Sequence, residues 1–382
     1  MILVSAVVAL AIVAAVRFTP TPPRHVANLP TQISDETFWQ MIENFSEPGG
    51  FFRSDNFVSN EREFQYVISE LKKSRPPGGV YLGVGPDQNF SYVVALEPAI
   101  AFIIDIRRQN MIQHLMYKAL IELSNDRADF LSRLFSRPLP QSLPADASAD
   151  DLFTSFAEIS PDRELFDDNL QRIVEHLTQK HGFKLSDDDL KSLEYVYTAF
   201  FEGGPDLTYS FSAGQGAMGA SSRSGNGFRF ARNMPSYAEL MVATDQEGHN
   251  RSYLANAENF KILQDLERRN VLIPIVGDFA GSKALRAVGD YLRKQDATVT
   301  AFYTSNVEQY LFQQRDDWSK FYSNVETLPI DSDSTFIRSV ASNRKFQTVS
   351  GRASLLCSIE DLLKAFRSHR LDSYAEVIWM SH

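Results

Sequence analysis

Two glycines and an aspartate have the residue types and the spacing of a nucleotide-binding site. Gly83 and Gly85 follow the apolar residues 80–82, and Asp105 ends the next apolar run. Glycines at the end of a strand let the backbone approach a ligand closely, and an acid roughly 20 residues later binds ribose hydroxyls. This pattern predicts a site for a nucleotide or an adenosyl compound.

The motif departs from the dinucleotide fingerprint, because Gln88 stands where a third glycine is expected. Asp87 falls in the first turn of the following helix, where a dinucleotide places its pyrophosphate, and like charges there repel. An ammonium or sulfonium group would be attracted instead. Asp87 therefore favours S-adenosylmethionine over NAD, although stabilisation of the helix dipole behind Pro86 would also explain an acid here.

Four apolar segments separated by helical patterns predict the scaffold that positions these residues. The segments are 80–84, 99–104, 271–276 and 299–303. They predict an α/β fold with a doubly wound, mostly parallel sheet, whose ligands bind beyond the carboxyl ends of the strands. Polar groups follow all four segments and should converge on one edge: Gly83 to Asn89, Asp105, Asp278 and Asn306.

The chain divides into five stretches by composition. Residues 1–17 form an apolar anchor or signal-like segment, and residues 18–33 form a proline-rich linker. The N-terminal helices and the first βαβ unit occupy 34–138, a helical insertion occupies 139–252, and the remaining βα units occupy 253–382. A last short strand is expected at 377–380.

Two loops in this scheme have more than one interpretation. Residues 51–61 alternate polar and aromatic side chains, which suits a loop that leads into a helix or a flap over the site. Residues 212–232 are rich in glycine and serine and contain three arginines, which suits a surface loop or a loop that closes on an anion. No P-loop sequence occurs in the chain.

The N-terminal apolar run predicts membrane association or export. The apolar run itself, residues 1–16, is shorter than the roughly 17–25 residues that span a bilayer and fits the apolar region of a signal peptide better. Arg17 and Arg24 follow the run instead of preceding it, which is the reverse of a signal peptide. The side of the membrane on which the globular part lies is left open.

Composition disfavours several classes of function. The chain has 382 residues and a net charge of −10, so we expect no nucleic-acid partner. The only cysteine, Cys357, permits no internal disulfide and no cysteine-based zinc site. The seven histidines show neither His-x-x-x-His nor His-Glu-x-x-His, so we expect no metal.

The order of the four strand ends resembles the class I S-adenosylmethionine-dependent methyltransferase fold, which is Rossmann-like. Residues 46–52, 54–56 and 81–108 more closely resemble an uncharacterised bacterial protein family with a methyltransferase-like domain, over about residues 46–137. The resemblance implies S-adenosylmethionine as cofactor and methyl transfer to an unknown acceptor. A non-catalytic, membrane-tethered interaction module of the same fold and an NAD-dependent oxidoreductase are the alternatives.

The resemblance also implies roles for particular residues. Gly83 and Gly85 would lie beside the methionine part of the cofactor, Asp105 would bind the ribose, and Asp278 would face the adenine amino group. The superfamily usually has an acid before the first glycine, where this chain has Leu82. Asp87 would then take over the contact with the ammonium group.

Five further residues are candidates near the cofactor or the acceptor. Asn89 and Arg107 are expected beside the cofactor, and Arg107 with Arg108 suits an acidic substrate. Asn306 and Glu308 lie where the superfamily often orients its acceptor, although Asn306 also suits a helix cap. Methyl transfer needs positioning more than a protein nucleophile, so the lack of a catalytic triad does not argue against it.

Overall fold

The computed structural model describes residues 28–74, 77–144, 146–210, 234–342, 345–346 and 351–382. The predicted anchor or signal-like segment, most of the linker and the glycine- and serine-rich loop lie outside the described residues. Within these ranges, no helix combines the length and the apolar character needed to cross a membrane.

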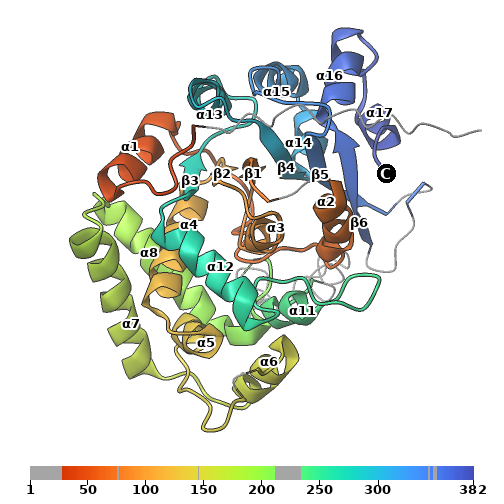
Figure 1. Cartoon of the computed structure of the whole chain (residues 1–382). Helices are drawn as coiled ribbons and strands as arrows, with labels where there is room; N and C mark the ends of the chain where they lie inside the picture. The colour runs from red at the N-terminus through yellow and green to blue at the C-terminus, as the bar shows by residue number, and fades with distance from the viewer. Residues whose placement is uncertain (1–27, 75–76, 145, 211–233, 343–344, 347–350) are drawn as a thin grey trace, which may run out of the picture.

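A six-stranded sheet with the order β3-β2-β1-β4-β5-β6 forms the centre of the molecule (Figure 1). The first five strands in the chain are parallel, and β6 is antiparallel to β5. The prediction of a mixed α/β fold with a mostly parallel sheet is therefore confirmed. The strands are β1 (Val80–Gly83), β2 (Ile100–Asp105), β3 (Leu272–Val276), β4 (Val299–Ser305), β5 (Thr335–Ala341) and β6 (Arg352–Ser358).

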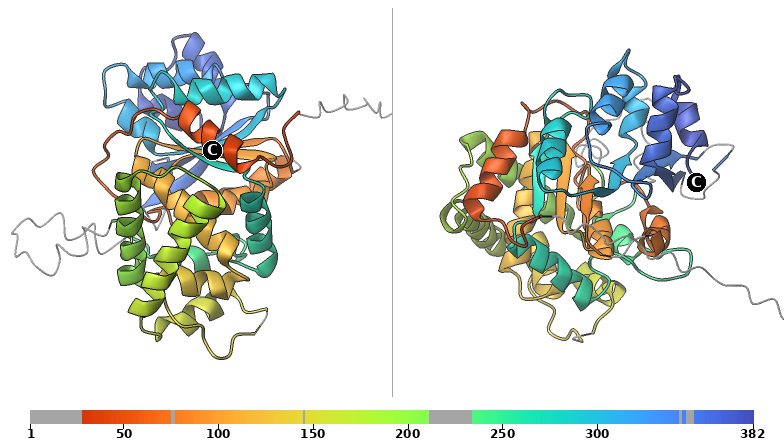
Figure 2. Two further views of the ribbon diagram at one scale, coloured as in Figure 1. Left: turned by 90° about the vertical axis from the view of Figure 1, so that its left-hand side faces the viewer. Right: turned by 45° about the horizontal axis from the view of Figure 1, so that its top comes forward.

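Helices cover both faces of the sheet (Figures 1 and 2). Every residue of β1, β2 and β3 is buried, as expected for parallel strands with helices on both sides. One face carries α1 (Asp35–Phe45), α13 (Ala284–Lys294), α15 (Asp317–Val325) and α16 (Ile359–Arg367). The other carries α2 (Ile68–Ser74), α3 (Gln88–Leu96), α4 (Arg108–Leu123) and α12 (Ala257–Arg268).

Further helices pack outside α4, so that α4 is enclosed between the sheet and α8 (Figure 2). Residues 110–121 of α4 are consequently all buried. The outer helices are α5 (Arg127–Phe135), α6 (Ala149–Ala157), α7 (Arg163–Glu175), α8 (Asp187–Gly203) and α11 (Tyr237–Val242). Short helical segments complete the fold: η1 (Phe64–Val67), η2 (His176–Lys180), η3 (Gly204–Asp206), α14 (Val307–Leu311) and α17 (Tyr374–Trp379).

A continuous hydrophobic cluster joins the sheet to all of these helical layers. Phe102 of β2, Tyr117 of α4 and Phe200 of α8 belong to it, and the rings of Tyr117 and Phe200 lie 5.7 Å apart. The helices of residues 139–252, predicted as an insertion, thus share their core with the sheet.

The prediction of a strand at 377–380 was wrong, because these residues belong largely to α17. Ser373 and Glu376 form a capping box that starts a helix, and Val377 and Ile378 are buried on one side of it. The edge strand on this side of the sheet is β6. The apolar pattern of the sequence predicted neither β5 nor β6.

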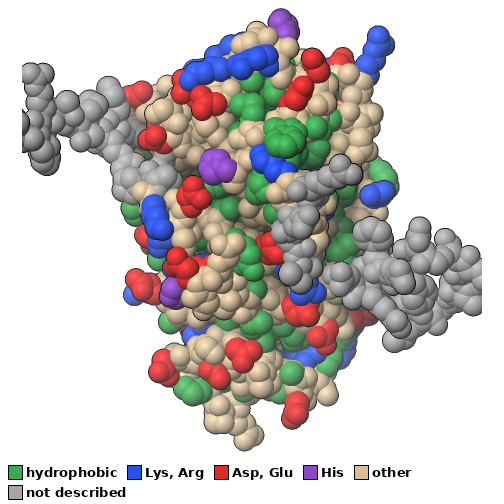
Figure 3. All heavy atoms as spheres, turned by 90° about the vertical axis from the view of Figure 1, so that its right-hand side faces the viewer, with side chains coloured by type: hydrophobic (Ala, Val, Ile, Leu, Met, Phe, Trp, Pro, Cys, Tyr) green, Lys and Arg blue, Asp and Glu red, His purple; other side chains and the backbone are tan. Residues whose placement is uncertain are grey.

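Acidic and basic side chains are interspersed over the face shown in Figure 3, which lies on the right of Figure 1. The visible part of this face therefore offers no broad basic surface of the kind that binds nucleic acid.

Candidate functional site

A cavity of about 330 Å³ lies at the carboxyl ends of β1, β2, β3 and β4. Gly85 follows β1, Asp105 ends β2, Asp278 follows β3 and Asn306 follows β4, and all four line the cavity. The structure thus brings together four candidates that lie far apart in the sequence. The volume is in the range of small-molecule sites, roughly 300–1,000 Å³.

Asn89 fixes the loop that contains the glycines and does not itself line the cavity. Its side-chain amide donates to the carbonyls of Val84 (2.9 Å) and Pro86 (2.7 Å), and its oxygen accepts a hydrogen bond from Tyr81 (2.8 Å). A side chain at Gly83 would collide with Asn89, so glycine is required there for packing. Gly85 has a φ of 79°, which only glycine adopts readily, and a side chain there would meet open space.

His114, on α4, holds the same loop from the other side. Its Nε2 lies 2.8 Å from the carbonyl oxygen of Gly85. Burial lowers the pKa of His114 to about 4, so the ring is neutral at pH 7, and Nε2 must carry the proton that it donates to Gly85. His114 is a positioning residue for the loop.

Asp105 and Arg107 form a bidentate ion pair at the cavity wall. Nε of Arg107 lies 2.9 Å from one oxygen of Asp105, and a second guanidinium nitrogen lies 2.7 Å from the other. The same guanidinium donates to the backbone carbonyl of Asp55. Because a carboxylate offers about four lone-pair sites, Asp105 can still accept hydrogen bonds from a ligand.

Residues 51–61 form one wall of the cavity, which is the location that the flap interpretation requires. Phe51, Phe52, Asn56, Ser59, Asn60 and Glu61 all line the cavity. The ring of Phe52 meets the ring of Tyr310 edge-on at 5.4 Å, so this wall contacts the segment that follows β4. Arg107 ties the wall to β2 through the carbonyl of Asp55.

Glu61 is the functional candidate that the sequence analysis missed. Its side chain lines the cavity but is only 3% exposed, and it accepts hydrogen bonds from Ser305 and, at 3.0 Å, from Gln88. It comes from a loop and not from a strand end, so the rule that found the other acids could not find it. The only signal was its place in the wall segment just before a helix.

Asp278 is a half-buried acid at the end of β3. Burial raises its pKa above the ordinary value, and the backbone N–H of Ala280 donates to its carboxylate at 2.9 Å. With Asp105 and Glu61, it gives the cavity three carboxyl groups from three separate elements.

Asp87 does not line the cavity. It is 2% exposed and accepts a 2.8 Å hydrogen bond from the hydroxyl of Tyr253, on the side of α3 that packs against the segment before α12. Burial raises its pKa to about 7. The charge argument that favoured S-adenosylmethionine because of Asp87 therefore has no geometric basis in this structure.

Glu308 and Arg108 also make protein contacts outside the cavity. Glu308 forms a buried bidentate ion pair with Arg338 and accepts a 2.7 Å hydrogen bond from Tyr322. Arg108 forms a bidentate pair with Asp189 at the start of α8. Asn306 stands at the start of α14, but its side chain makes no capping hydrogen bond.

The chain belongs to a family described as a domain of unknown function (DUF7790), whose model matches residues 56–139 and 156–374. The matched residues include the six strands and the four strand ends that form the cavity. No curated protein matches the chain.

Proposed function

We propose that the chain is an S-adenosylmethionine-dependent methyltransferase, or a close binding relative, with a Rossmann-like fold of the methyltransferase type. The strand order reverses between β1 and β4, and ligands of open α/β sheets bind at such a switch point. The cavity lies there. The dinucleotide-binding fold has the same strand order, 3-2-1-4-5-6. It differs in the direction of the last strand, because its two mononucleotide-binding halves are parallel, whereas β6 here is antiparallel to β5.

The charge of the cavity is the observation that carries this proposal. Asp105, Asp278 and Glu61 contribute carboxyl groups, and Arg107 is the only basic residue among the described lining residues. Its guanidinium is already paired with Asp105. Such a site suits a ligand with cationic groups, such as a sulfonium and an ammonium, better than a pyrophosphate.

The start of α3 gives a second argument against a pyrophosphate. Helix N-termini bind phosphate through free backbone N–H groups. Pro86, which lines the cavity just before this helix, has no N–H to donate. A pyrophosphate placed beside Gly85 would therefore find fewer donors than in the usual dinucleotide site.

The lining residues can bind and orient the reactants of a methyl transfer. S-adenosylmethionine supplies an electrophilic methyl group, and its in-line transfer depends on alignment of the acceptor. The rings of Phe52, Phe279 and Tyr310 provide apolar walls for an adenine. Glu61 and Asn306 are the polar groups that we assign to the acceptor, Glu61 as a base where the acceptor must lose a proton.

Calorimetric titration with S-adenosylhomocysteine tests the proposal. We expect binding by the full chain and at least about tenfold weaker binding by Asp278→Ala, because one adenine contact is lost. Asp188→Ala, at a side chain that is 92% exposed on α8, is the matched control and should bind normally. No heat at millimolar ligand, with the protein folded, would contradict the proposal and favour the non-catalytic interaction module.

The oxidoreductase alternative has a different readout. It predicts quenching of protein fluorescence on titration with NADH, and loss of the quenching in Asp105→Ala. Quenching by NADH together with no heat from S-adenosylhomocysteine would reverse our choice of cofactor.

We propose membrane association or export through residues 1–17. Protease protection in intact cells tests on which side of the membrane the globular part lies. Because S-adenosylmethionine is made in the cytosol, a location outside the inner membrane would count against the enzyme.

A further inference from the structure

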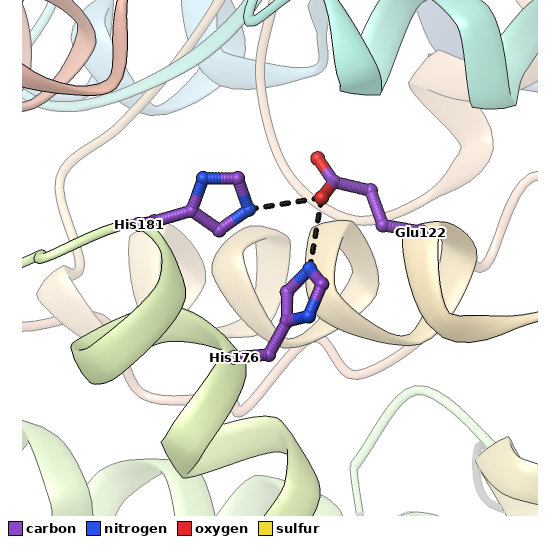
Figure 4. Close-up of side chains that lie close together, drawn as sticks. All are labelled: Glu122, His176 and His181. Atoms are coloured by element: carbon purple, nitrogen blue, oxygen red, sulfur yellow. Dashed lines mark hydrogen bonds and ion pairs between the residues drawn. The ribbon is translucent and has the colours of Figure 1, made fainter.

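Glu122, His176 and His181 converge far from the cavity (Figure 4). Nε2 of His176 lies 2.8 Å from Oε2 of Glu122, and Nε2 of His181 lies 2.9 Å from the same oxygen. All three side chains are nearly buried, with exposed fractions of 2% to 7%. Two imidazole nitrogens and a carboxylate oxygen form a common ligand set for zinc.

A π-helical turn explains why the histidine spacing escaped the sequence analysis. The segment η2 (His176–Lys180) is a π-helix, and the N–H of His181 donates to the carbonyl of His176 at 3.1 Å. In an α-helix, residues five apart point in different directions, whereas an i to i+5 turn places them on one side. Histidines that bind a metal from one face of an α-helix are typically four residues apart, whereas His176 and His181 are five apart.

Asp35 determines which ring nitrogen of His181 carries a proton. Nδ1 of His181 lies 2.7 Å from Oδ1 of Asp35, which also accepts a hydrogen bond from Asn270 at 2.8 Å. Nδ1 must therefore donate its proton to Asp35. Nε2 then faces Glu122 either with a second proton or with a lone pair that requires a cation. A metal-binding histidine typically has this carboxylate partner on its other nitrogen.

Glu122 turns one of its two carboxylate oxygens toward the histidines. Lys118 contacts the second oxygen, Oε1, at 2.7 Å and leaves Oε2 facing the histidines.

Lys180 approaches Oε2 at 3.5 Å, but its side chain is 60% exposed and can move into solvent. The ligand atoms would have to separate from their present 2.8–2.9 Å to about 3.3 Å, the edge of a tetrahedral zinc site. A shift of this size is within the reach of side-chain rotation.

We propose that Glu122, His176 and His181 form a site for a divalent transition metal ion of the zinc class, with Asp35 orienting His181. Water would complete the coordination. The ion would link α4 to η2 and, through Asp35, to α1, which lies on the other face of the sheet.

The role of this ion is structural and separate from the proposed methyl transfer. Glu122 lies at the end of α4, whereas the cavity lies beside its start. With a rise of 1.5 Å per residue, the two sites are about 20 Å apart. Loss of the metal should therefore affect stability before it affects the cavity.

Zinc binding by the full, tag-free chain tests the proposal. After treatment with a chelator, we expect dialysis against zinc to restore about one ion per chain and to raise the melting temperature. His176→Gln and His181→Gln should each lose the ion. Asp35→Asn should weaken zinc affinity about 10–100-fold.

Controls keep the test specific. His249→Gln alters the other group of metal-ligand residues in the described part of the chain, Asp245, Glu247 and His249, and should bind zinc normally. Cobalt added to the unmodified chain should give the visible absorption of a tetrahedral site. This measurement does not depend on whether any variant folds. The proposal is overturned if the unmodified chain binds neither zinc nor cobalt, because a proton on Nε2 of His181 would then account for its contact with Glu122. It is also overturned if His249→Gln abolishes zinc binding.

Discussion

The side-chain amide of Asn89 holds the loop beside the cavity by donating to backbone carbonyls on two sides of Gly85. Residue types alone do not distinguish such a support from a ligand contact, since both require a polar side chain close to a glycine loop. The contacts of Asn89 identify it as a support, because both polar atoms of its side chain form hydrogen bonds within the protein.

Replacing Asn89 should therefore destabilise the protein. Asn89→Ala leaves the Tyr81 hydroxyl and the Val84 carbonyl without their side-chain partner and should cost about 2–3 kcal/mol in the free energy of unfolding. Asn89→Asp should cost more, because a carboxylate oxygen would then face the carbonyls of Val84 and Pro86. Urea denaturation measures both, and an Asn89→Asp variant as stable as the unmodified protein would contradict the assignment.

Asp87 should make the stability of the protein depend on pH. Burial raises its pKa from 3.8 to about 7 in the folded state, so the folded protein keeps a proton that the unfolded chain releases between these values. Its contribution to stability is present below about pH 4 and is lost as the pH rises to about 7. The full loss is about 4 kcal/mol.

Comparison with Asp87→Asn isolates this effect, because the amide has no titration. The variant should gain stability relative to the unmodified protein as the pH rises from 4 to 8. Buried His114 has the opposite dependence in both proteins, because its pKa is lowered to about 4, and so cancels in the difference. Unfolding curves that stay parallel over this range would show that Asp87 is ionised in the folded state.

At the level of elements, the wall formed by residues 51–61 should matter more for binding than for folding. Phe52→Ala removes a ring that packs on Tyr310 and lines the cavity. We expect S-adenosylhomocysteine to bind about tenfold more weakly, because an aromatic contact contributes about 1–1.5 kcal/mol. The melting temperature should change little.

Leu139→Ala provides the control, since this apolar side chain is 53% exposed and does not line the cavity. Equal affinities of Phe52→Ala and the unmodified protein, with binding otherwise intact, would show that the wall does not contact the ligand.

The elements near the glycine motif could be predicted, because buried parallel strands are apolar throughout and end abruptly in polar residues. The sequence could not show which way the acid at the N-cap of α3 points, and in the structure Asp87 is buried against Tyr253. The apolar residues 377–380 favoured a strand, although Ser373 and Glu376 already carried the signal of a helix start. Glu61 is positioned by a loop, and His176 and His181 are brought together by a π-turn. Neither a loop nor a single π-turn leaves a periodic pattern of apolar residues in the sequence, so these residues could not be predicted.

On the scale of the whole molecule, the continuous core predicts a single unfolding transition. Side chains of the sheet and of the helices in 139–252 belong to one cluster, so neither part can lose its packing without the other. Calorimetry should show one peak, with equal calorimetric and van't Hoff enthalpies. Two separated peaks would mean that the predicted insertion folds independently.

The ion pair between Glu308 and Arg338 also limits how the family can diverge. Losing one partner leaves a buried charge without compensation, at a cost of about 3–5 kcal/mol, whereas replacing both with apolar residues is nearly neutral. Related chains should therefore keep both residues or have lost both, and an ancestor that lost only one would have been selected against. An alignment in which the two positions vary independently would contradict this expectation.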